Sequence, residues 1–316
     1  MEIIRGLPNI RERHEGCVAT IGTFDGVHLG HKQLLTSTKK RAVEFNTQSL
    51  LVTFEPQPRE YFRGSRVPAR LTRFREKVAL FDQEGIDQVL CIPFNERTSS
   101  IHAQAVIEQF FVRMLSIRHL VVGDDFRFGS NAEGDFDMLK TAGKRHGFGV
   151  DQIPTLELDG KRVSSTLIRE VLARGDLNLA SKLLGRRYFM MGTVVKGRQI
   201  GKTLGVPTAN IRLQRYRSAI EGIFAVTVQG LGRDLRGSAY VGTRPTIQGT
   251  DPLLEVHLFD FDRDLYGSRL KITFLKKFRD DRAFGSIEEL QEQMFQDLSD
   301  IRTWFDSHDE TRTVLV

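Results

Sequence analysis

The sequence predicts an α/β domain with a doubly wound parallel sheet over residues 1–184, joined to an antiparallel β-barrel with a terminal helix over residues 185–316. Its 316 residues are about twice the usual length of one domain, which favours two separate cores. Before Gly185, apolar segments of strand length alternate with segments of helical period. After Gly185, strand-like segments follow one another closely, and glycines separate them. This change sets the predicted domain boundary.

Four strands are expected in the first half, each a short run rich in Val, Ile, Leu and Phe and bounded by Gly, Asn, Pro or Asp. They are CVATIGTF (17–24), SLLVTF (49–54), IDQVLCIPF (86–94) and HLVVGDDF (119–126). Apolar residues recur with helical period over 30–45, 69–84, 101–116 and 164–185. Strands that alternate with helices of this length predict right-handed crossover connections and a parallel sheet.

Five strand-like segments are expected in the second half, with no helix between them: 192–197, 222–230, 238–243, 253–262 and 269–278. Close spacing and frequent glycines predict an antiparallel barrel or sandwich, and we favour the barrel. Helical period returns over 286–305, where Ser286 is the expected N-cap and Glu289 lies three residues later, as in a capping box. A terminal helix is therefore expected after the barrel.

The composition is that of an ordinary globular protein, with 40% hydrophobic and 27% charged residues, which excludes a disordered, collagen-like or coiled-coil chain. No apolar run approaches the ~18 residues that a membrane span needs, and no export signal is evident. We therefore expect a soluble, cytoplasmic protein with no membrane partner. Cys17 and Cys91 lie in apolar strand-like segments, where a thiol behaves as a small hydrophobic group.

The 46 Lys and Arg residues exceed the 40 Asp and Glu residues, and the formal net charge of +6 favours polyanionic partners. Charge alone does not choose among nucleotides, nucleic acids and acidic lipids. We expect no nucleic-acid partner, because the sequence has no helix-turn-helix, zinc knuckle or RNP-like motif and anionic substrates already account for a basic surface. The sequence does not indicate an oligomeric state.

The first predicted strand runs directly into GTFDGVHLGHKQLL (22–35), at the edge of the sheet where ligands of doubly wound folds bind. His28 and His31 lie at the start of the next helix, and helix N-termini attract phosphate. Two histidines at this spacing can stabilise the charge that develops on phosphates when pyrophosphate leaves. The alternative is a pair of loop histidines beside a tight turn, but the position after the first strand favours the phosphate site.

Two further polar segments are candidates for the same site. Asp125 ends the predicted strand at 119–126, where it either contacts a metal ion or closes a turn. The segment SSTLIR (164–169) places hydroxyls and free N–H groups at a helix start, with Arg169 as a charged fork. The alternative is a serine cap followed by a solvated arginine.

Together these segments resemble a known family. HLGH (28–31) is similar to the signature of HxGH nucleotidylyltransferases, and FEPQP (54–58), GDDFRFG (123–129) and SSTLIR follow as in the FMN adenylyltransferase half of the bacterial bifunctional riboflavin kinase/FAD synthetase. The resemblance implies AMP transfer from ATP to FMN, which yields FAD and pyrophosphate. Many family members have His where this chain has Gln57, so no acid–base role is assigned there. The implied FMN contact is Asp125, and the implied ATP contacts are Gly22, Phe24, Asp25, His28, His31, Ser164, Thr166 and Arg169.

A glycine-rich segment, GTVVKGRQIGKTLGVPTAN (192–210), opens the second half. It is not a P-loop, because Gly197 and Gly201 are one residue too close together and no βαβ unit surrounds them. Backbone N–H groups can still approach phosphates at these glycines, and Lys202 supplies positive charge. Taken alone, PTAN at the end of the segment is equally consistent with a Pro-Thr turn and a capping Asn.

PTAN and the preceding loop resemble the riboflavin kinase family, as do GIFAV (222–226), GTRPT (242–246), EVHLFDFDRDLYG (255–267) and KKFRDDRAF (276–284) in the same order. By this resemblance Thr208 and Asn210 bind Mg²⁺, which prefers hard oxygen ligands. Glu255, on the polar face of a predicted strand, is the implied catalytic carboxylate that takes the proton of the riboflavin 5′-hydroxyl. The implied ATP contacts are Gly197, Gly201, Lys202 and Tyr266, and the implied flavin contacts are Arg279, Arg282 and Phe284.

The expected protein is a bifunctional enzyme with ATP, riboflavin, FMN and FAD as its partners and Mg²⁺ as its metal. No KxDG lysine motif is present, which favours direct in-line attack over a covalent nucleotide intermediate. Three alternatives stay open: only one half is active, the first half uses a different phosphate acceptor, or the chain is a flavin- or nucleic-acid-binding module.

Overall fold

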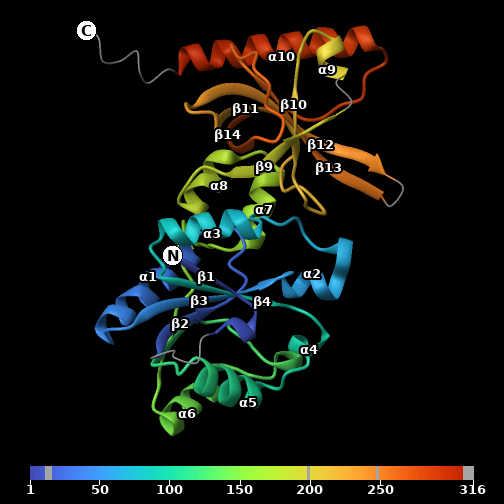
Figure 1. Cartoon of the computed structure of the whole chain (residues 1–316). Helices are drawn as coiled ribbons and strands as arrows, with labels where there is room; N and C mark the ends of the chain where they lie inside the picture. Colours follow the sequence, from blue (N-terminus) through green and yellow to red (C-terminus); the bar gives the residue numbers. More distant parts are fainter. Residues whose placement is uncertain (11–15, 198–199, 247–248, 309–316) are drawn as a thin grey trace, which may run out of the picture. The chain divides into compact units, whose positions relative to one another are not determined.

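The computed structural model describes residues 1–10, 16–197, 200–246 and 249–308 (Figure 1). The chain forms two compact units, the first of Met1–Pro68 and Thr72–Ser165 and the second of Ala69–Leu71 and Thr166–Val316. The units divide near Ser165, whereas the boundary expected from the sequence lies at 184. The intervening residues belong with the second unit, because α8 (Leu177–Leu184) packs against the barrel strand β14 (Arg269–Arg279).

The first unit is built on a six-stranded parallel sheet with strand order β1-β4-β3-β2-β5-β6. Its strands are β1 (Glu2–Arg5), β2 (Cys17–Ile21), β3 (Gln48–Glu55), β4 (Gln88–Pro93), β5 (His119–Gly123) and β6 (Gly149–Ile153). The four predicted strands are all present. The sequence does not predict the edge strands β1 and β6, because exposed or partly exposed residues interrupt the apolar pattern in both.

Helices connect these strands: α1 (Leu29–Glu44), α2 (Pro58–Arg63), α3 (Phe74–Gln83), α4 (Glu96–Ser99), α5 (Ala103–Ala105), a π-helix (Val106–Met114) and α6 (Phe136–His146). Short 3₁₀ turns lie at Leu7–Asn9, Gly64–Arg66 and Ser130–Ala132. The helix expected over 101–116 is therefore mostly π-helical. The helix expected over 164–185 is two helices, α7 (Ser165–Ala173) and α8, because Gly175 takes a left-handed φ of 78° and Asp176 caps the second helix.

Both faces of the sheet are buried, as a doubly wound fold requires. Ala19 of β2 belongs to a core that contains Ile107 of the π-helix and Leu139 of α6. Its neighbour Val18 packs instead with Ala42 of α1. Figure 1 shows α5 and α6 on one side of the sheet and α1 on the other. The doubly wound parallel sheet predicted from the sequence is confirmed.

The second unit contains a closed antiparallel barrel with strand order β10-β13-β12-β11-β14-β9. Besides β14, its strands are β9 (Phe189–Val195), β10 (Ala209–Arg212), β11 (Gly222–Gln229), β12 (Leu235–Thr246) and β13 (Gly249–Leu258). The predicted barrel is confirmed with two differences. Strand β10 is too short for its sequence pattern to be recognised as a strand. One helical turn, α9 (Ile200–Thr203), lies where no helix is expected.

The terminal helix α10 (Ile287–Ser307) is confirmed with Ser286 as its N-cap, whereas the Glu289 carboxylate of the expected capping box accepts a hydrogen bond from the Gly285 N–H at 3.0 Å. The Ser286 Oγ accepts a hydrogen bond from the Glu289 N–H at 3.1 Å. Ile301 and Phe305 of this helix pack with Ile223 of β11 in one hydrophobic core. Figure 1 shows α10 lying across the barrel, so the helix covers strands that would otherwise expose apolar side chains.

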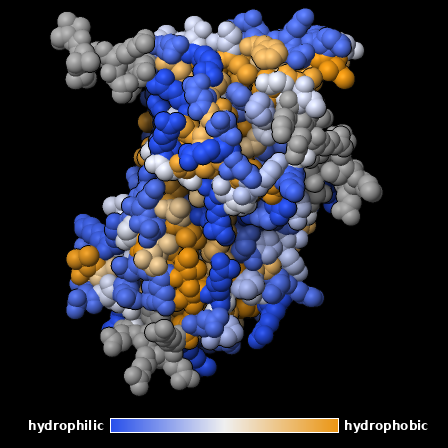
Figure 2. Space-filling model, turned by 45° about the horizontal axis from the view of Figure 1, so that its top comes forward, coloured by the Kyte–Doolittle hydropathy of each residue, from blue (hydrophilic) through white to orange (hydrophobic). Residues whose placement is uncertain are grey.

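The face of the molecule that Figure 2 shows is mostly hydrophilic, with smaller hydrophobic patches. Among the described residues, no helix is long and apolar enough to cross a membrane. Cys17 and Cys91 are buried free thiols, and burial raises the pKa of both. Neither thiol is therefore a ready nucleophile.

His119, at the start of β5, makes the stability of the first unit depend on pH. Its ring is buried, and burial lowers its pKa more than the Asp151 carboxylate, 3.1 Å from Nε2, raises it. The unfolded chain therefore takes up a proton first as the pH falls below the ordinary histidine pKa of about 6.5. The contribution of His119 to the free energy of unfolding is therefore complete above that pH and decreases below it.

We expect the unfolding free energy to decrease between about pH 7.5 and pH 5.5 because of this ring, and His119→Asn to lessen that decrease. Urea unfolding followed by circular dichroism measures the effect. The exposed His146→Asn is the control, and it should keep the wild-type pH dependence. An equal decrease in His119→Asn and in the wild type would contradict the prediction.

Candidate active sites

The loop after β2 carries the first candidate site, and its backbone is strained. Phe24 and Val27 have φ values of 49° and 42°, in the left-handed region that such side chains rarely adopt, and Gly26 has a φ of 88°. Each such non-glycine residue costs about 1–3 kcal/mol and persists only where its surroundings enforce it. Gly22 begins the loop, where a side chain would meet the Phe24 ring at 3.3 Å. Strain of this kind clusters at functional sites.

The two predicted histidines cap α1 reciprocally. His28 Nδ1 accepts a hydrogen bond from the His31 N–H at 3.3 Å, and His31 Nδ1 accepts one from the His28 N–H at 3.4 Å. The rings stack with their centroids 3.6 Å apart. Because each Nδ1 is an acceptor, the proton of each neutral ring lies on Nε2. Both histidines thus offer an N–H donor at a helix start, where phosphates bind.

Asp25 lies buried inside this loop. Its Oδ1 accepts a hydrogen bond from the Thr72 N–H at 3.0 Å, and its carbonyl accepts one from Ser165 Oγ at 2.7 Å. The residue therefore helps to hold the loop in place, and its expected role as an ATP contact stays a prediction. Ser165 was not among the predicted site residues, yet it attaches the start of α7 to the loop, and Ser164 directly precedes it in the chain.

Asp125 is exposed at the carboxyl end of β5 and forms an ion pair with Arg162. Arg162 belongs to a short hairpin of β7 (Glu157–Leu158) and β8 (Lys161–Arg162). The neighbouring Asp124 accepts hydrogen bonds from the N–H and the hydroxyl of Thr155, at 2.8 and 2.9 Å. The structure thus brings a basic residue to Asp125 that the sequence does not predict.

Aromatic side chains gather where β3 and β4 end. Phe54, Tyr61, Phe62 and Phe94 form edge-to-face pairs with centroids 5.2 to 5.8 Å apart. The Phe62 side chain is 68% exposed. Exposed aromatic rings at the carboxyl end of a parallel sheet suit a planar ligand. No periodic pattern marks these rings, so only their convergence in the structure reveals them.

Gln57 is the N-cap residue of α2, close in sequence to these aromatic residues. Its side chain is buried, and its Nε2 has no hydrogen-bond partner among the described residues. An unpaired buried amide donor costs free energy until something accepts its hydrogen bond. The Gln57 side chain is therefore suited to donate a hydrogen bond to a ligand, although an amide cannot act as an acid or a base.

The other predicted ATP contacts of the first half, Thr166 and Arg169, lie on α7 in the second unit. Arg169 Nε donates a hydrogen bond to the Ala69 carbonyl at 2.5 Å. The guanidinium thus holds the short segment Ala69–Leu71, which also belongs to the second unit. The expectation that Thr166 and Arg169 complete the ATP site stays a prediction.

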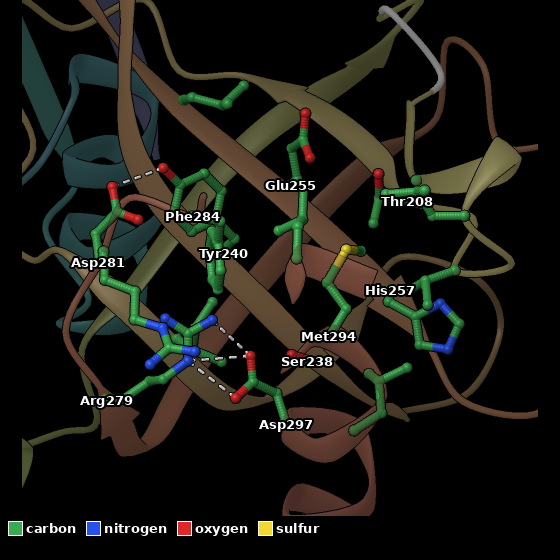
Figure 3. A pocket seen from close by; sticks show the side chains of 18 of the residues that line it. Thr208, Ser238, Tyr240, Glu255, His257, Arg279, Asp281, Phe284, Met294 and Asp297 are labelled. Carbon is green, nitrogen blue, oxygen red and sulfur yellow. Dashed lines mark hydrogen bonds and ion pairs between the residues drawn. The ribbon is translucent and has the colours of Figure 1, made fainter. Parts of the chain in front are cut away.

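The barrel unit contains a pocket of about 350 Å³ between barrel strands, the segment after β14 and helix α10 (Figure 3). Most of the residues predicted for this half line it: Gly201, Thr208, Asn210, Glu255, Arg279, Arg282 and Phe284. The structure therefore brings together residues from distant parts of the sequence, as one site requires.

Glu255 points into this pocket from β13. It shares the pocket face with His257, whereas Val256 between them is buried in the barrel core, as the predicted alternation requires. In the barrel register Glu255 lies opposite Asn210 on β10 and Tyr240 on β12. Figure 3 shows the carboxylate between the positions of Thr208 and Tyr240. The carboxylate is thus placed beside the two predicted metal ligands.

Thr208 and Asn210 offer oxygen atoms to the pocket, and two glycines make room for them. A side chain at Gly197 would lie 2.3 Å from the Asn210 amide, and one at Gly201 would lie 2.4 Å from the Val206 carbonyl oxygen and 3.1 Å from Thr208 Oγ1. Gly197 is therefore required by close packing on Asn210, and Gly201 mainly by close packing on the backbone that precedes Thr208. A hydroxyl and an amide oxygen are hard donors that fit Mg²⁺ when nucleotide phosphates and water complete its coordination.

Arg279 is held at the other side of the pocket by a buried carboxylate. Its Nε and Nη2 donate to the two oxygens of Asp297 on α10, at 2.7 to 3.1 Å, and Gln293 Nε2 donates to the same carboxylate at 2.8 Å. The guanidinium groups of Arg279 and Arg282 lie 5.7 and 4.8 Å from the Phe284 ring centroid. The sequence does not predict Asp297, although a charged residue on the apolar face of α10 was an available signal.

On the flavin contact that the family resemblance implies for Arg279, we expect Asp297→Asn to raise the KM for riboflavin about tenfold, because Arg279 loses the charged, two-pronged hydrogen bonding that orients it. Stability should fall by about 2 kcal/mol, since removing one partner leaves a largely buried charge. Initial rates at varied riboflavin and the fluorescence of Trp304, the one tryptophan, measure the two effects. The exposed Asp300→Asn on the same helix is the control. An unchanged KM in Asp297→Asn would refute this role for Asp297.

Two predicted contacts of this half, Gly197 and Tyr266, do not line the pocket. Tyr266 is 47% exposed, and its N–H donates to Asp264 Oδ1 at 2.9 Å. The side chain of Lys202 lies outside the part that the structure describes. Tyr240 and Asp281 line the pocket without having been predicted, and the Tyr240 hydroxyl donates to Asp281 Oδ2 at 2.8 Å. Burial and this carboxylate raise the pKa of Tyr240, so its phenol stays a donor.

The α/β unit has paired histidines at the start of α1, and the barrel unit has a pocket that contains a carboxylate. Together they define a protein with two sites, both suited to binding nucleotides and to the chemistry of phosphate groups. The family model for FAD synthetase matches residues 10–167, and the model for riboflavin kinase matches residues 184–305. The chain belongs to the family of bifunctional riboflavin kinases/FMN adenylyltransferases.

The similarity to known members of this family extends over nearly the whole chain. The chain is 46% identical to the bifunctional riboflavin kinase/FMN adenylyltransferase of Pseudomonas fluorescens, over 96% of this chain and 97% of the relative. It is 44% identical to the protein of the same name from Escherichia coli strain K12, over 96% and 98%. A crystal structure described as a macrolide-efflux protein from Streptococcus pneumoniae superposes with a TM-score of 0.80 at 27% identity, over 96% of this chain and 100% of that one. That likeness concerns the fold of the whole chain.

Proposed function

We propose that this chain phosphorylates riboflavin to FMN with ATP and then transfers AMP from a second ATP to FMN, which yields FAD and pyrophosphate. The observation that carries the proposal is that one chain holds both the paired histidines and the pocket with Glu255, Thr208 and Asn210. The named activities of its full-length relatives support it. We keep the boundary expected from the sequence and assign residues 1–184 to adenylyl transfer and 185–316 to phosphorylation, since the FAD synthetase match ends at 167 and the riboflavin kinase match begins at 184. Helices α7 and α8, which lie mostly between the two matches, are grouped with the barrel unit by their contacts. The use of ATP in both reactions supports a cytoplasmic location.

In adenylyl transfer, a phosphate oxygen of FMN attacks the α-phosphorus of ATP, and the bond to the β-phosphate breaks as pyrophosphate leaves. Negative charge develops on the leaving group, and the Nε2–H groups of His28 and His31 donate to its oxygens. The exposed rings around Phe62 receive the flavin ring, and Asp125 with Arg162 lies at the FMN side. Further ATP contacts are assigned to Gly22, Phe24, Asp25, Ser164, Thr166 and Arg169.

In phosphorylation, Glu255 accepts the proton of the riboflavin 5′-hydroxyl as its oxygen attacks the γ-phosphorus of ATP. Thr208 and Asn210 would hold Mg²⁺, which neutralises charge on the nucleotide phosphates when bound. The glycines at 197 and 201, with Lys202 and Tyr266, are assigned to ATP.

The flavin ring is assigned to the far side of the pocket. There Phe284 offers a ring face, and Arg279 and Arg282 offer donors to the polar edge of the flavin. Because Asp297 holds Arg279 in place before the flavin binds, little side-chain freedom is lost on binding.

Chromatography of riboflavin, FMN and FAD tests the proposal. Purified protein is incubated with riboflavin, ATP and Mg²⁺, and in parallel with FMN as the flavin. FMN that forms first and FAD that follows, with FAD also formed from FMN, is the expected result. FMN that accumulates without FAD would refute adenylyl transfer to FMN, whereas FAD formed from FMN with no conversion of riboflavin would refute the kinase assignment.

A further inference from the structure

Lys77, on α3, is a fully buried lysine that neither proposed reaction uses directly. Its exposed fraction is 0%, and its Nζ donates to the Thr23 carbonyl at 3.0 Å and to the Thr53 hydroxyl at 3.4 Å. Lysine is almost never buried completely, because the ammonium group loses its hydration. A buried ammonium that ends on the loop after β2 therefore points to a role for that loop.

Thr72, just before α3, holds the same loop at its centre. Its Oγ1 accepts a hydrogen bond from the Gly26 N–H at 2.8 Å, and its own N–H donates to Asp25 Oδ1 at 3.0 Å. Thr72 and Asp25 are both buried. The segment from Thr72 to Lys77 thus forms hydrogen bonds with the loop at three residues, Thr23, Asp25 and Gly26.

These contacts act where the backbone is most strained. Phe24 and Val27 have left-handed φ values, and such residues relax toward ordinary conformations unless their surroundings prevent it. The loop ends at His28, so its conformation decides where His28 and His31 present their Nε2–H groups. Lys77 and Thr72 are too deeply buried to touch a nucleotide themselves.

We propose that Lys77 and Thr72 are positioning residues for adenylyl transfer, which hold the loop of residues 23–27 in its strained form and thereby place the donors of His28 and His31. This inference rests on the adenylyl transfer proposed above for the same site. Displacement of catalytic groups by about 1 Å can cost about 10²-fold in rate, so loss of the contacts made by Lys77 or Thr72 should have a measurable effect.

The test compares Lys77→Met and Thr72→Val, which keep the side-chain volume but lose the donor or acceptor. For both we expect FAD formation from FMN to fall about 10²-fold in kcat/KM, with a several-fold rise in the KM for ATP. Riboflavin phosphorylation should keep its wild-type rate. Thr72→Ser, which retains the hydroxyl, should restore most of the activity. Arg75→Met, an exposed cation on the same helix, is the matched control and should behave as the wild type.

The KM for ATP separates positioning from folding, because a smaller folded fraction lowers kcat but leaves KM unchanged. A fall in kcat alone, in proportion to the folded fraction, would overturn the proposal, as would wild-type constants in Thr72→Val. If Lys77→Met does not fold, the comparison of Thr72→Val with Thr72→Ser decides. If the wild type itself forms no FAD from FMN, the adenylyl-transfer assignment fails together with this inference. If the wild type forms FAD and the variants behave like it, only the positioning role of Lys77 and Thr72 fails.

Discussion

Replacing His28 with asparagine should lower the rate of FAD formation from FMN by about 10²- to 10³-fold, the loss typical of removing one preorganised donor to a developing charge. Asparagine is a good N-cap, so it can still accept the His31 N–H at the start of α1. What it lacks is the Nε2–H donor beyond the cap. The double variant with His31→Asn should lose more, since both donors face the same leaving group.

Riboflavin phosphorylation by the same molecules is the internal control for this experiment, because the barrel pocket contains neither histidine. The exposed His146→Asn on α6 is the matched variant and should form FAD at the wild-type rate. Rates are measured by chromatography of the flavins at saturating ATP. Wild-type FAD formation in His28→Asn would show that the ring contributes only a helix cap.

Replacing Glu255 with glutamine should lower riboflavin phosphorylation by about 10²- to 10⁴-fold, the usual contribution of a positioned general base. Glutamine keeps the size of the side chain and its place between Asn210 and Tyr240 in the barrel register. It cannot accept the proton of the attacking hydroxyl. The loss should therefore fall mainly on kcat, whereas the KM for riboflavin changes little.

FAD formation from FMN serves as the control in Glu255→Gln, since it requires only the first unit in the proposed scheme. The exposed carboxylate of Glu292 on α10 offers the matched variant Glu292→Gln, which should leave both activities intact. Loss of both reactions in Glu255→Gln would indicate misfolding, and thermal unfolding followed at Trp304 would show it. Retention of the kinase rate would remove Glu255 from the mechanism.

Much of the fold could be predicted from local signals. Apolar runs of strand length and the helical period predict the parallel sheet, and glycine-separated strands predict the barrel, because both patterns record which side of each element is buried. The histidine pair is marked locally by its position directly after a recognisable strand, whereas Glu255 was singled out by the family resemblance, because a glutamate on the polar face of a strand is usually only solvated. The predicted bounds of helices were less accurate where a glycine or a π-helical segment interrupts the helix, as at Gly175.

Only the tertiary structure decided which side chains meet across long sequence distances. The Asp25 carboxylate accepts a hydrogen bond from Thr72, 47 residues away, and Lys77 reaches the same loop from 54 residues away. Asp297 likewise reaches Arg279 from another element. The sequence by itself determined the elements, their order and the chemistry available at each loop, because these depend on neighbours along the chain. Packing decided which of those groups face a ligand and which brace the site, because burial and partnership depend on neighbours in space.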